Sequence, residues 1–148
     1  MLIGISPLIS PELLSILHRM GHGDEIVLAD AHFPGEGIHP RVIRADGLEI
    51  APLLDAILPL FALDKTDSPL IMMMPSEADI LDESVELAYW HAVARHWPDT
   101  SPIGKIDRFA FYERARKAFA VVMTGETRTH ANIILKKGVI PIQNRNYL

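Results

Sequence analysis

The segment Met20-Gly-His-Gly-Asp-Glu-Ile-Val-Leu-Ala-Asp-Ala-His-Phe-Pro34 carries the strongest signal in this chain. Its apolar run, residues 26–29, is short, continuous and partly β-branched, and turn residues bound it, so it predicts a buried strand. His22 lies between two glycines just before the run, and Asp30 and His32 follow it. Enzymes of the α/β class build sites from such strand ends, although solvated turns explain the pattern about equally well.

The composition predicts one globular domain covering residues 1–148, with 49% hydrophobic and 22% charged residues. A net charge of −5 gives no electrostatic support to nucleic-acid binding. The chain has no cysteine, which excludes disulfides, thiolate metal sites and a cysteine nucleophile. We expect a cytoplasmic protein without a signal peptide or a membrane span, because no apolar run approaches the ~20 residues that a span needs.

Apolar periodicity and turn residues predict strands that alternate with helices along the rest of the chain. Residues 50–61 form the clearest predicted helix, and Pro59 predicts that its last turn is irregular. Several strands are apolar on both faces, which is typical of an α/β domain whose helices cover both sides of a mixed or largely parallel sheet. The other predicted helices are residues 11–20, 82–97 and 108–118, and the predicted strands are 26–29, 41–44, 70–74, 102–105 (leading into one), 119–123 and 132–135.

The polar residues allow two kinds of site. His22, Asp24, Asp30 and His32 could ligate zinc or a similar ion, as in a metal-dependent hydrolase, but no further ligand has a diagnostic spacing. Phosphate-binding glycine loops and the common hydrolase motifs are absent from the sequence.

The second kind of site needs no metal. His22 can exchange a proton near neutral pH, and Asp30 can accept hydrogen bonds from hydroxyl groups. Arg108 offers a fork of donors, and the Asn132 amide both donates and accepts. Such sets of side chains hold neutral polyols, although a structural role also explains each residue taken alone.

The chain resembles the L-fucose mutarotase family, a sister of the D-ribose pyranases in the RbsD/FucU superfamily. The likeness extends from about residue 5 to residue 139. The segment Arg108-Phe-Ala-Phe-Tyr-Glu-Arg114 looks like the fucose branch, since the ribose branch has a histidine-containing segment there. The other segments that carry the resemblance are residues 5–14, 20–34, 42–48, 124–126 and 132–139.

The resemblance implies a three-layer α/β/α sandwich around a mixed, largely parallel sheet. It implies an isomerase that interconverts the α and β anomers of a free monosaccharide, with L-fucose expected first, and that needs no cofactor. The family's catalytic histidine falls on His22, and its sugar-binding aspartate and arginine fall on Asp30 and Arg108. Family members form ring-like homo-oligomers, often decamers of stacked pentamers, in which a neighbouring subunit completes each site.

The sequence departs from the family in the segment that is usually Tyr-Gly-Asn, which here is His130, Ala131 and Asn132. We expect these three residues to bind the sugar, but the missing tyrosine puts the identity of that sugar in question. Ring opening and reclosure need a proton delivered to the ring oxygen, which we assign to His22, and a base, which is a water or His130. A non-catalytic sugar-binding accessory to transport and a metal-dependent hydrolase are the competing hypotheses.

Overall fold

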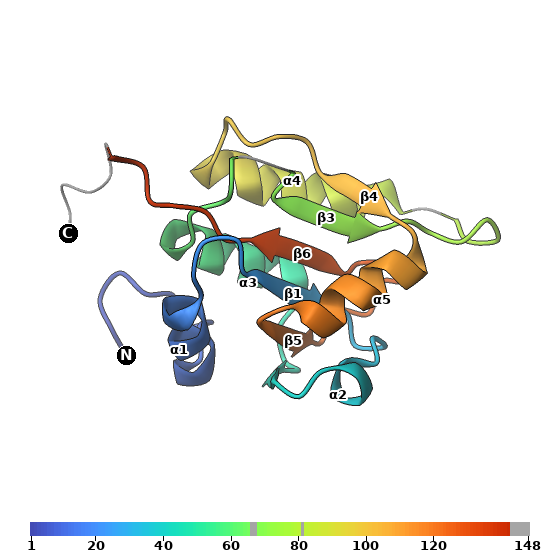
Figure 1. Cartoon of the computed structure of the whole chain (residues 1–148), viewed down its shortest axis with the longest axis horizontal. Helices are drawn as coiled ribbons and strands as arrows, with labels where there is room; N and C mark the ends of the chain where they lie inside the picture. The colour runs from blue at the N-terminus through green and yellow to red at the C-terminus, as the bar shows by residue number, and fades with distance from the viewer. Residues whose placement is uncertain (66–67, 81, 143–148) are drawn as a thin grey trace.

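The computed structural model describes residues 1–65, 68–80 and 82–142 (Figure 1). Nearly all of the tail at residues 142–148, for which the sequence predicts no pattern, lies outside the described residues. The helices of the described ranges are all too short or too polar to cross a membrane.

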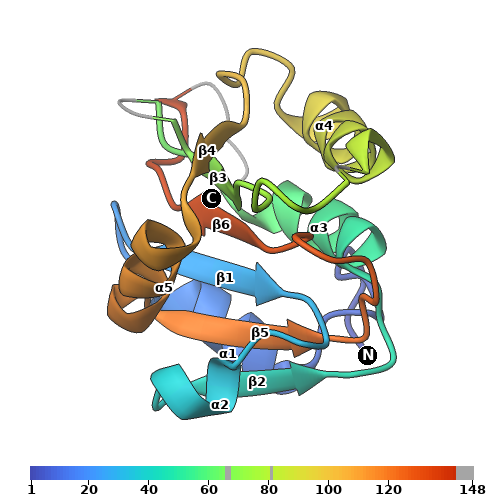
Figure 2. The same ribbon diagram turned by 90° about the vertical axis from the view of Figure 1, so that its right-hand side faces the viewer.

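The described strands form one sheet of six strands in the order β2-β5-β1-β6-β3-β4. The β1/β5, β2/β5 and β3/β4 pairs are parallel, and β6 is antiparallel to both of its neighbours, β1 and β3. Figure 2 shows β6 crossing the middle of the sheet. The strands are β1 (Glu25–Ala29), β2 (Val42–Ala45), β3 (Leu70–Met73), β4 (Gly104–Ile106), β5 (Ala120–Thr124) and β6 (Ile133–Lys136).

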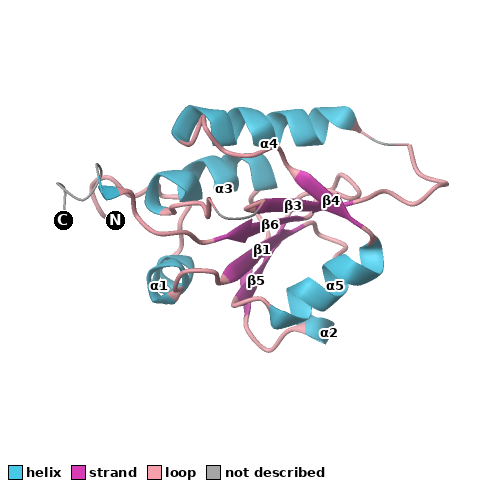
Figure 3. Ribbon diagram, turned by 45° about the horizontal axis from the view of Figure 1, so that its top comes forward, coloured by secondary structure: helices cyan, strands magenta, loops and turns pink. Residues whose placement is uncertain are grey.

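Helices cover both faces of the sheet, so the predicted three-layer α/β/α sandwich is confirmed (Figure 3). One face packs its apolar side chains against α1, α3 and α4, and the other packs against α2 and α5. Alternate residues of the central strands serve the two layers: Ile26 and Leu28 face one core, and Val27 and Ala29 face the other. The helices are α1 (Pro11–Arg19), α2 (Gly35–Ile38), α3 (Ile50–Ile57), the 3₁₀ turn η1 (Leu58–Leu60), α4 (Glu83–His96) and α5 (Arg108–Lys117).

The helix boundaries follow from local chemistry. Ser10 caps α1, since its hydroxyl accepts a hydrogen bond from the Leu13 N–H at 3.1 Å. The helix of residues 50–61 changes from α to 3₁₀ geometry at Leu58, as Pro59 predicts, because proline cannot donate an interior hydrogen bond.

One segment differs from expectation. The two prolines and two glycines of residues 33–40 predict a loop, but four of these residues form the short helix α2. Gly35 begins this helix against β5, where an added Cβ would lie 2.5 Å from the Met123 sulfur. The glycine therefore permits a close helix-to-sheet approach instead of a flexible turn.

Candidate sugar-binding hollow

Four of the six predicted site residues meet at one edge of the sheet. Asp30 follows β1 and Arg108 begins α5 after β4, while His130 and Asn132 precede the antiparallel strand β6. The carboxyl ends of parallel strands share one edge, and the start of an antiparallel strand lies at that same edge. The side chains of these four predicted residues line an open hollow of about 190 Å³, together with those of His32, Phe33, Met73, Tyr112 and Thr129.

Asp30 and Asn132 form the floor of this hollow, and both are buried. The Asp30 N–H donates to Asn132 Oδ1 at 2.7 Å, and the His32 N–H donates to Asp30 Oδ1 at 3.0 Å. Burial raises the pKa of the Asp30 carboxyl above its ordinary value, although hydrogen bonds from the His32 N–H and the Asn132 side chain oppose that rise. The two residues therefore place a fixed carboxyl group and a fixed amide at the hollow.

Arg108 lies at the rim, on the first turn of α5. Asp107 caps this helix by accepting hydrogen bonds from the N–H groups of Phe109 and Ala110, at 2.9 and 3.0 Å. The Arg108 guanidinium lies 5.2 Å from the centre of the exposed Phe109 ring. The cap fixes the backbone from which Arg108 reaches the hollow, while the side chain keeps its donors exposed to a ligand.

His130 has a left-handed backbone, with φ of 56°. This conformation costs energy for a residue with a side chain, so neighbouring contacts must hold it. His130 Nε2 lies 2.7 Å from Asp79 Oδ2, and hydrogen bonds from Ser76 and His130 lower the pKa of that carboxyl. Because a carboxylate can only accept, His130 donates a hydrogen bond to Asp79 through Nε2–H. In the neutral ring, Nδ1 is then the nitrogen that can accept a hydrogen bond.

The loop that carries His130 is anchored by a buried acid. Both Glu126 carboxylate oxygens accept from the Arg128 guanidinium at 2.9 Å, which lowers the pKa of Glu126. The Glu126 carbonyl accepts from the Ala31 N–H at 2.8 Å, which ties the loop to the chain just after Asp30.

Two predicted residues lie elsewhere. Ala131 is fully buried, and its carbonyl accepts a hydrogen bond from the hydroxyl of Tyr89 at 2.7 Å, so its side chain does not line the hollow. His22 lies before β1, at the opposite edge of the sheet from Asp30. A strand of five residues spans about 16 Å, so His22 and the hollow of the same chain are well separated.

Other residues of the hollow were not predicted as site residues. Phe33 contacts the rings of Phe111 and Tyr112 edge-on, at centroid distances of 5.9 and 5.5 Å, and so fixes Tyr112 in the wall. Tyr112 follows Arg108 by four residues, and that spacing on a predicted helix places the two on one face. The signal was therefore present in the sequence. Thr129 lines the hollow beside His130 and has no comparable signal.

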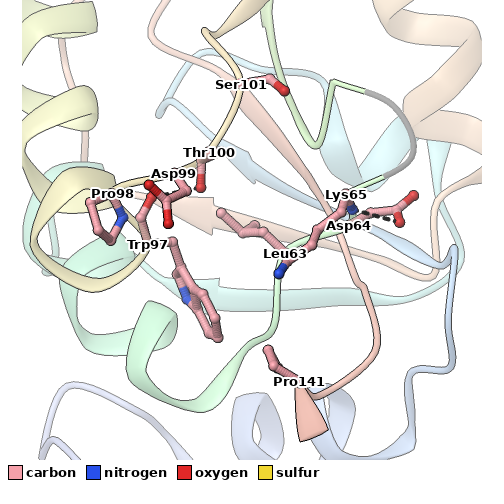
Figure 4. A pocket seen from close by; sticks show the side chains of 9 residues that line it. All are labelled: Leu63, Asp64, Lys65, Trp97, Pro98, Asp99, Thr100, Ser101 and Pro141. Carbon is pink, nitrogen blue, oxygen red and sulfur yellow. Dashed lines mark hydrogen bonds between the residues drawn. The ribbon is translucent and has the colours of Figure 1, made fainter. Parts of the chain in front are cut away.

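The geometry does not assemble the predicted metal ligands within one chain, because His22 lies far from Asp30 and His32. Across the described ranges, no three histidine, aspartate or glutamate side chains gather to hold an ion. A second cavity, of about 290 Å³, lies between Leu63, Trp97 and Pro141 (Figure 4). None of the six predicted site residues lines it.

The fold and the hollow define an α/β protein with a set of side chains suited to a small polyhydroxylated ligand. The chain belongs to the RbsD / FucU transport protein family, whose profile matches residues 3–140.

Solved structures of several proteins are similar to this chain in sequence and fold. A fucose mutarotase from Streptococcus pneumoniae, in complex with L-fucose, is 45% identical; the match covers 95% of this chain and 100% of that one, with a TM-score of 0.90. FucU from Bifidobacterium longum is 39% identical, over 93% and 99% of the two chains, with a TM-score of 0.89. RbsD from Bacillus subtilis, complexed with D-ribose, is 22% identical over 95% and 100%, and its TM-score of 0.70 shows a shared fold.

Proposed function

We propose that this protein is a sugar mutarotase that interconverts the α and β anomers of a free monosaccharide, with L-fucose as the first candidate. The proposal is supported by the hollow that holds Asp30, Arg108 and Asn132 in a chain 45% identical to a fucose mutarotase crystallised with L-fucose. A carboxyl, a guanidinium and an amide together supply donors and acceptors for several sugar hydroxyls. The reaction needs neither a metal nor a cofactor.

Mutarotation requires little from the site. A base removes the proton of the anomeric hydroxyl, an acid protonates the ring oxygen, and the C1–O5 bond breaks to give an open-chain aldehyde. C1 then rotates and the ring recloses with both protons returned. Positioned acid–base groups typically contribute ~10²–10⁴-fold, and the uncatalysed reaction already proceeds in water.

His22 is our candidate for the acid that protonates the ring oxygen. The His22 that serves each hollow comes from a second copy of the chain. Its side chain is 55% exposed, at the edge of the sheet opposite the hollow. A homo-oligomeric ring, such as a pentamer-based decamer, can bring the His22 edge of one copy to the hollow of the next. Exposed apolar side chains beside the hollow, Phe109 and Ile80, are suited to such a contact.

His130 or a water takes the proton of the anomeric hydroxyl. His130 lines the hollow, and its Nε2 contact to Asp79 leaves Nδ1 to accept a proton. Asp79 would stabilise the charged ring that forms.

Proton NMR exchange between anomeric signals tests the reaction with L-fucose, D-ribose and D-galactose. We expect faster exchange for L-fucose with the wild-type protein and loss of most of the acceleration in His22→Ala. His91→Ala is the matched control, because His91 is exposed on α4. An unchanged rate in His22→Ala would rule out the assignment of the acid.

A complementation experiment tests whether sites are shared between copies. His22→Ala and Arg108→Ala should each be inactive alone, but co-expressed and co-assembled chains should regain activity, because some sites then draw an intact residue from each variant. Mixed assemblies without activity would mean that both residues serve a site within one chain.

A non-catalytic accessory to sugar transport is the second candidate, favoured by the description of the family as a transport protein family. A folded protein that binds one of these sugars without speeding its exchange would support that alternative.

A further inference from the structure

The proposed function gives no role to Asp64, a buried carboxylate beside His22, our candidate for the acid. Asp64 is 5% exposed, and its Oδ1 lies 3.4 Å from His22 Nε2. This contact is at the long end of the hydrogen-bond range, as is common when no substrate fixes the ring. The two residues come from segments far apart in the chain, so the fold has to bring them together.

The backbone around Asp64 is fixed by the end of β6. The Asp64 N–H donates to the Lys136 carbonyl at 3.0 Å, and the Gly138 N–H donates to the Ala62 carbonyl at 2.7 Å. Between these two bonds, Leu63 forms an antiparallel bridge with Lys137. Asp64 is therefore held by the sheet and does not depend on His22 for its position.

The Asp64 carboxylate is also held. Its Oδ1 accepts from the Lys65 N–H at 2.8 Å, and its Oδ2 lies 3.6 Å from the ammonium of Lys136. Asp64 is among the residues that line the second cavity, and Figure 4 shows its carboxylate pointing away from Trp97 and Asp99.

The turn that carries His22 is hydrogen-bonded to Lys137, next to the residues that hold the Asp64 segment. The Gly23 N–H donates to the Lys137 carbonyl at 2.8 Å, and the Lys137 N–H donates to the Asp24 carbonyl at 2.9 Å. Gly23 has φ of 87°, a conformation that glycine adopts without strain. Residues 136–138 therefore bind both the His22 turn and the Asp64 segment, and they set the separation of the two side chains.

We infer that Asp64 is a positioning residue for His22. Asp64 accepts a hydrogen bond from Nε2–H, so Nδ1 faces the sugar, and when both ring nitrogens are protonated Nδ1–H delivers the proton to the ring oxygen. The reason is that a histidine nitrogen facing a fixed carboxylate carries the proton, and the other nitrogen is then the one that serves the substrate. This inference rests on the proposed function, because it gives His22 its role, but the orientation of the ring can be measured without activity.

The test uses the full-length protein labelled with ¹⁵N on histidine. Long-range ¹H–¹⁵N spectra identify which ring nitrogen of His22 carries the proton in the neutral form, and anomeric exchange gives kcat and KM. We expect Nε2–H in the wild type. In Asp64→Asn, whose amide can donate as well as accept, we expect a mixture of tautomers and a fall in kcat on the order of tenfold, with KM unchanged.

Asp55→Asn is the matched control, since Asp55 contacts His96 Nε2 at 2.9 Å on the surface, away from this turn. It should leave the His22 spectrum and kcat unchanged. The inference is overturned if the wild-type ring carries its proton on Nδ1, or if Asp64→Asn changes only the tautomer, only kcat or only the free energy of unfolding. If the wild type speeds no sugar, the proposed function fails, while the tautomer still decides which way the ring is held.

Discussion

Asp30 and Asn132, which are 102 positions apart in the sequence, are joined by a buried 2.7 Å hydrogen bond from the Asp30 N–H to Asn132 Oδ1. Asp30 directly follows β1, and Asn132 directly precedes β6, the antiparallel strand beside it. Because this bond joins the two groups at the hollow, we expect a change in either residue to alter stability as well as the proposed sugar binding.

Replacing Asn132 by alanine should destabilise the protein. The buried Asp30 N–H would lose its acceptor, and an unpaired buried donor costs about 1–3 kcal/mol. Urea denaturation at fixed protein concentration measures the free energy of unfolding. Thr129→Ala, an exposed residue of the same loop, is the control and should change it little. A value for Asn132→Ala within error of the wild type would mean that water replaces the amide.

The raised pKa of Asp30 predicts how stability depends on pH. Burial makes the folded state hold the Asp30 proton more tightly than the unfolded state does. Between the two pKa values the folded state binds more protons, so the Asp30 contribution to stability falls as the pH rises through that window. The penalty is fully present above the folded pKa, and it is absent below the unfolded one.

Asp30→Asn removes this ionisation and retains an oxygen that can accept from the His32 N–H. The variant should therefore gain stability relative to the wild type at pH 7, and the gain should shrink at pH 4. Unfolding free energies of the two proteins at both pH values measure the difference. A gain that is the same at both values would show that Asp30 keeps an ordinary pKa.

Much of the fold was predictable because its signals are local. Apolar runs with turn residues on both sides locate the strands, and Ser10 and Pro59 act on their own neighbours in the chain. The antiparallel direction of β6 and its place between β1 and β3 were not predictable. Strand order depends on which apolar faces pack together over the whole chain, and no residue of β6 encodes it alone.

The site was predictable to the extent that its residues follow strand ends. Asp30 and Arg108 lie at the shared edge for this reason, whereas Ala131 is buried and its carbonyl is bonded to Tyr89, a residue far away in the sequence. The contact between His22 and Asp64 depends on backbone bonds to residues 136–138, which link three distant segments. Sequence spacing contains no information about such a contact.

Arg108→Lys should raise KM for the sugar by about tenfold, because lysine retains the charge but loses the planar fork that binds two hydroxyls at once. The value of kcat should change less, since the role that we propose for Arg108 is to bind the sugar and not to transfer protons. Arg116→Lys is the control on the same helix, where Arg116 pairs with Glu113 on the exposed side. A fall in kcat at constant KM would instead give Arg108 a role in the chemistry.

His130→Tyr should move the preference toward L-fucose. The larger ring offers more apolar surface to the C6 methyl group, which D-ribose lacks, and one methyl group in an apolar pocket is worth about tenfold. The measurement is the ratio of kcat/KM for L-fucose to that for D-ribose. His130→Asn, which tolerates the left-handed backbone but has no ring, is the control and should not raise this ratio. An unchanged ratio in His130→Tyr would place the determinant of sugar choice elsewhere.

Gly138→Ala should damage the end of the molecule that carries His22. An added Cβ would lie 2.5 Å from the Leu63 carbonyl oxygen and 2.8 Å from the Asp64 Cα, and these backbone atoms cannot move without breaking the pairing of residues 62–64 with residues 136–138. Overpacking of this kind costs about 1–3 kcal/mol. We expect that loss in urea denaturation, together with a fall in kcat, because Asp64 is displaced from His22. Gly37→Ala is the control, since nothing lies within 4 Å of its added Cβ. Wild-type stability and kcat in Gly138→Ala would show that the Asp64 segment can shift freely, and it could then not hold the ring of His22.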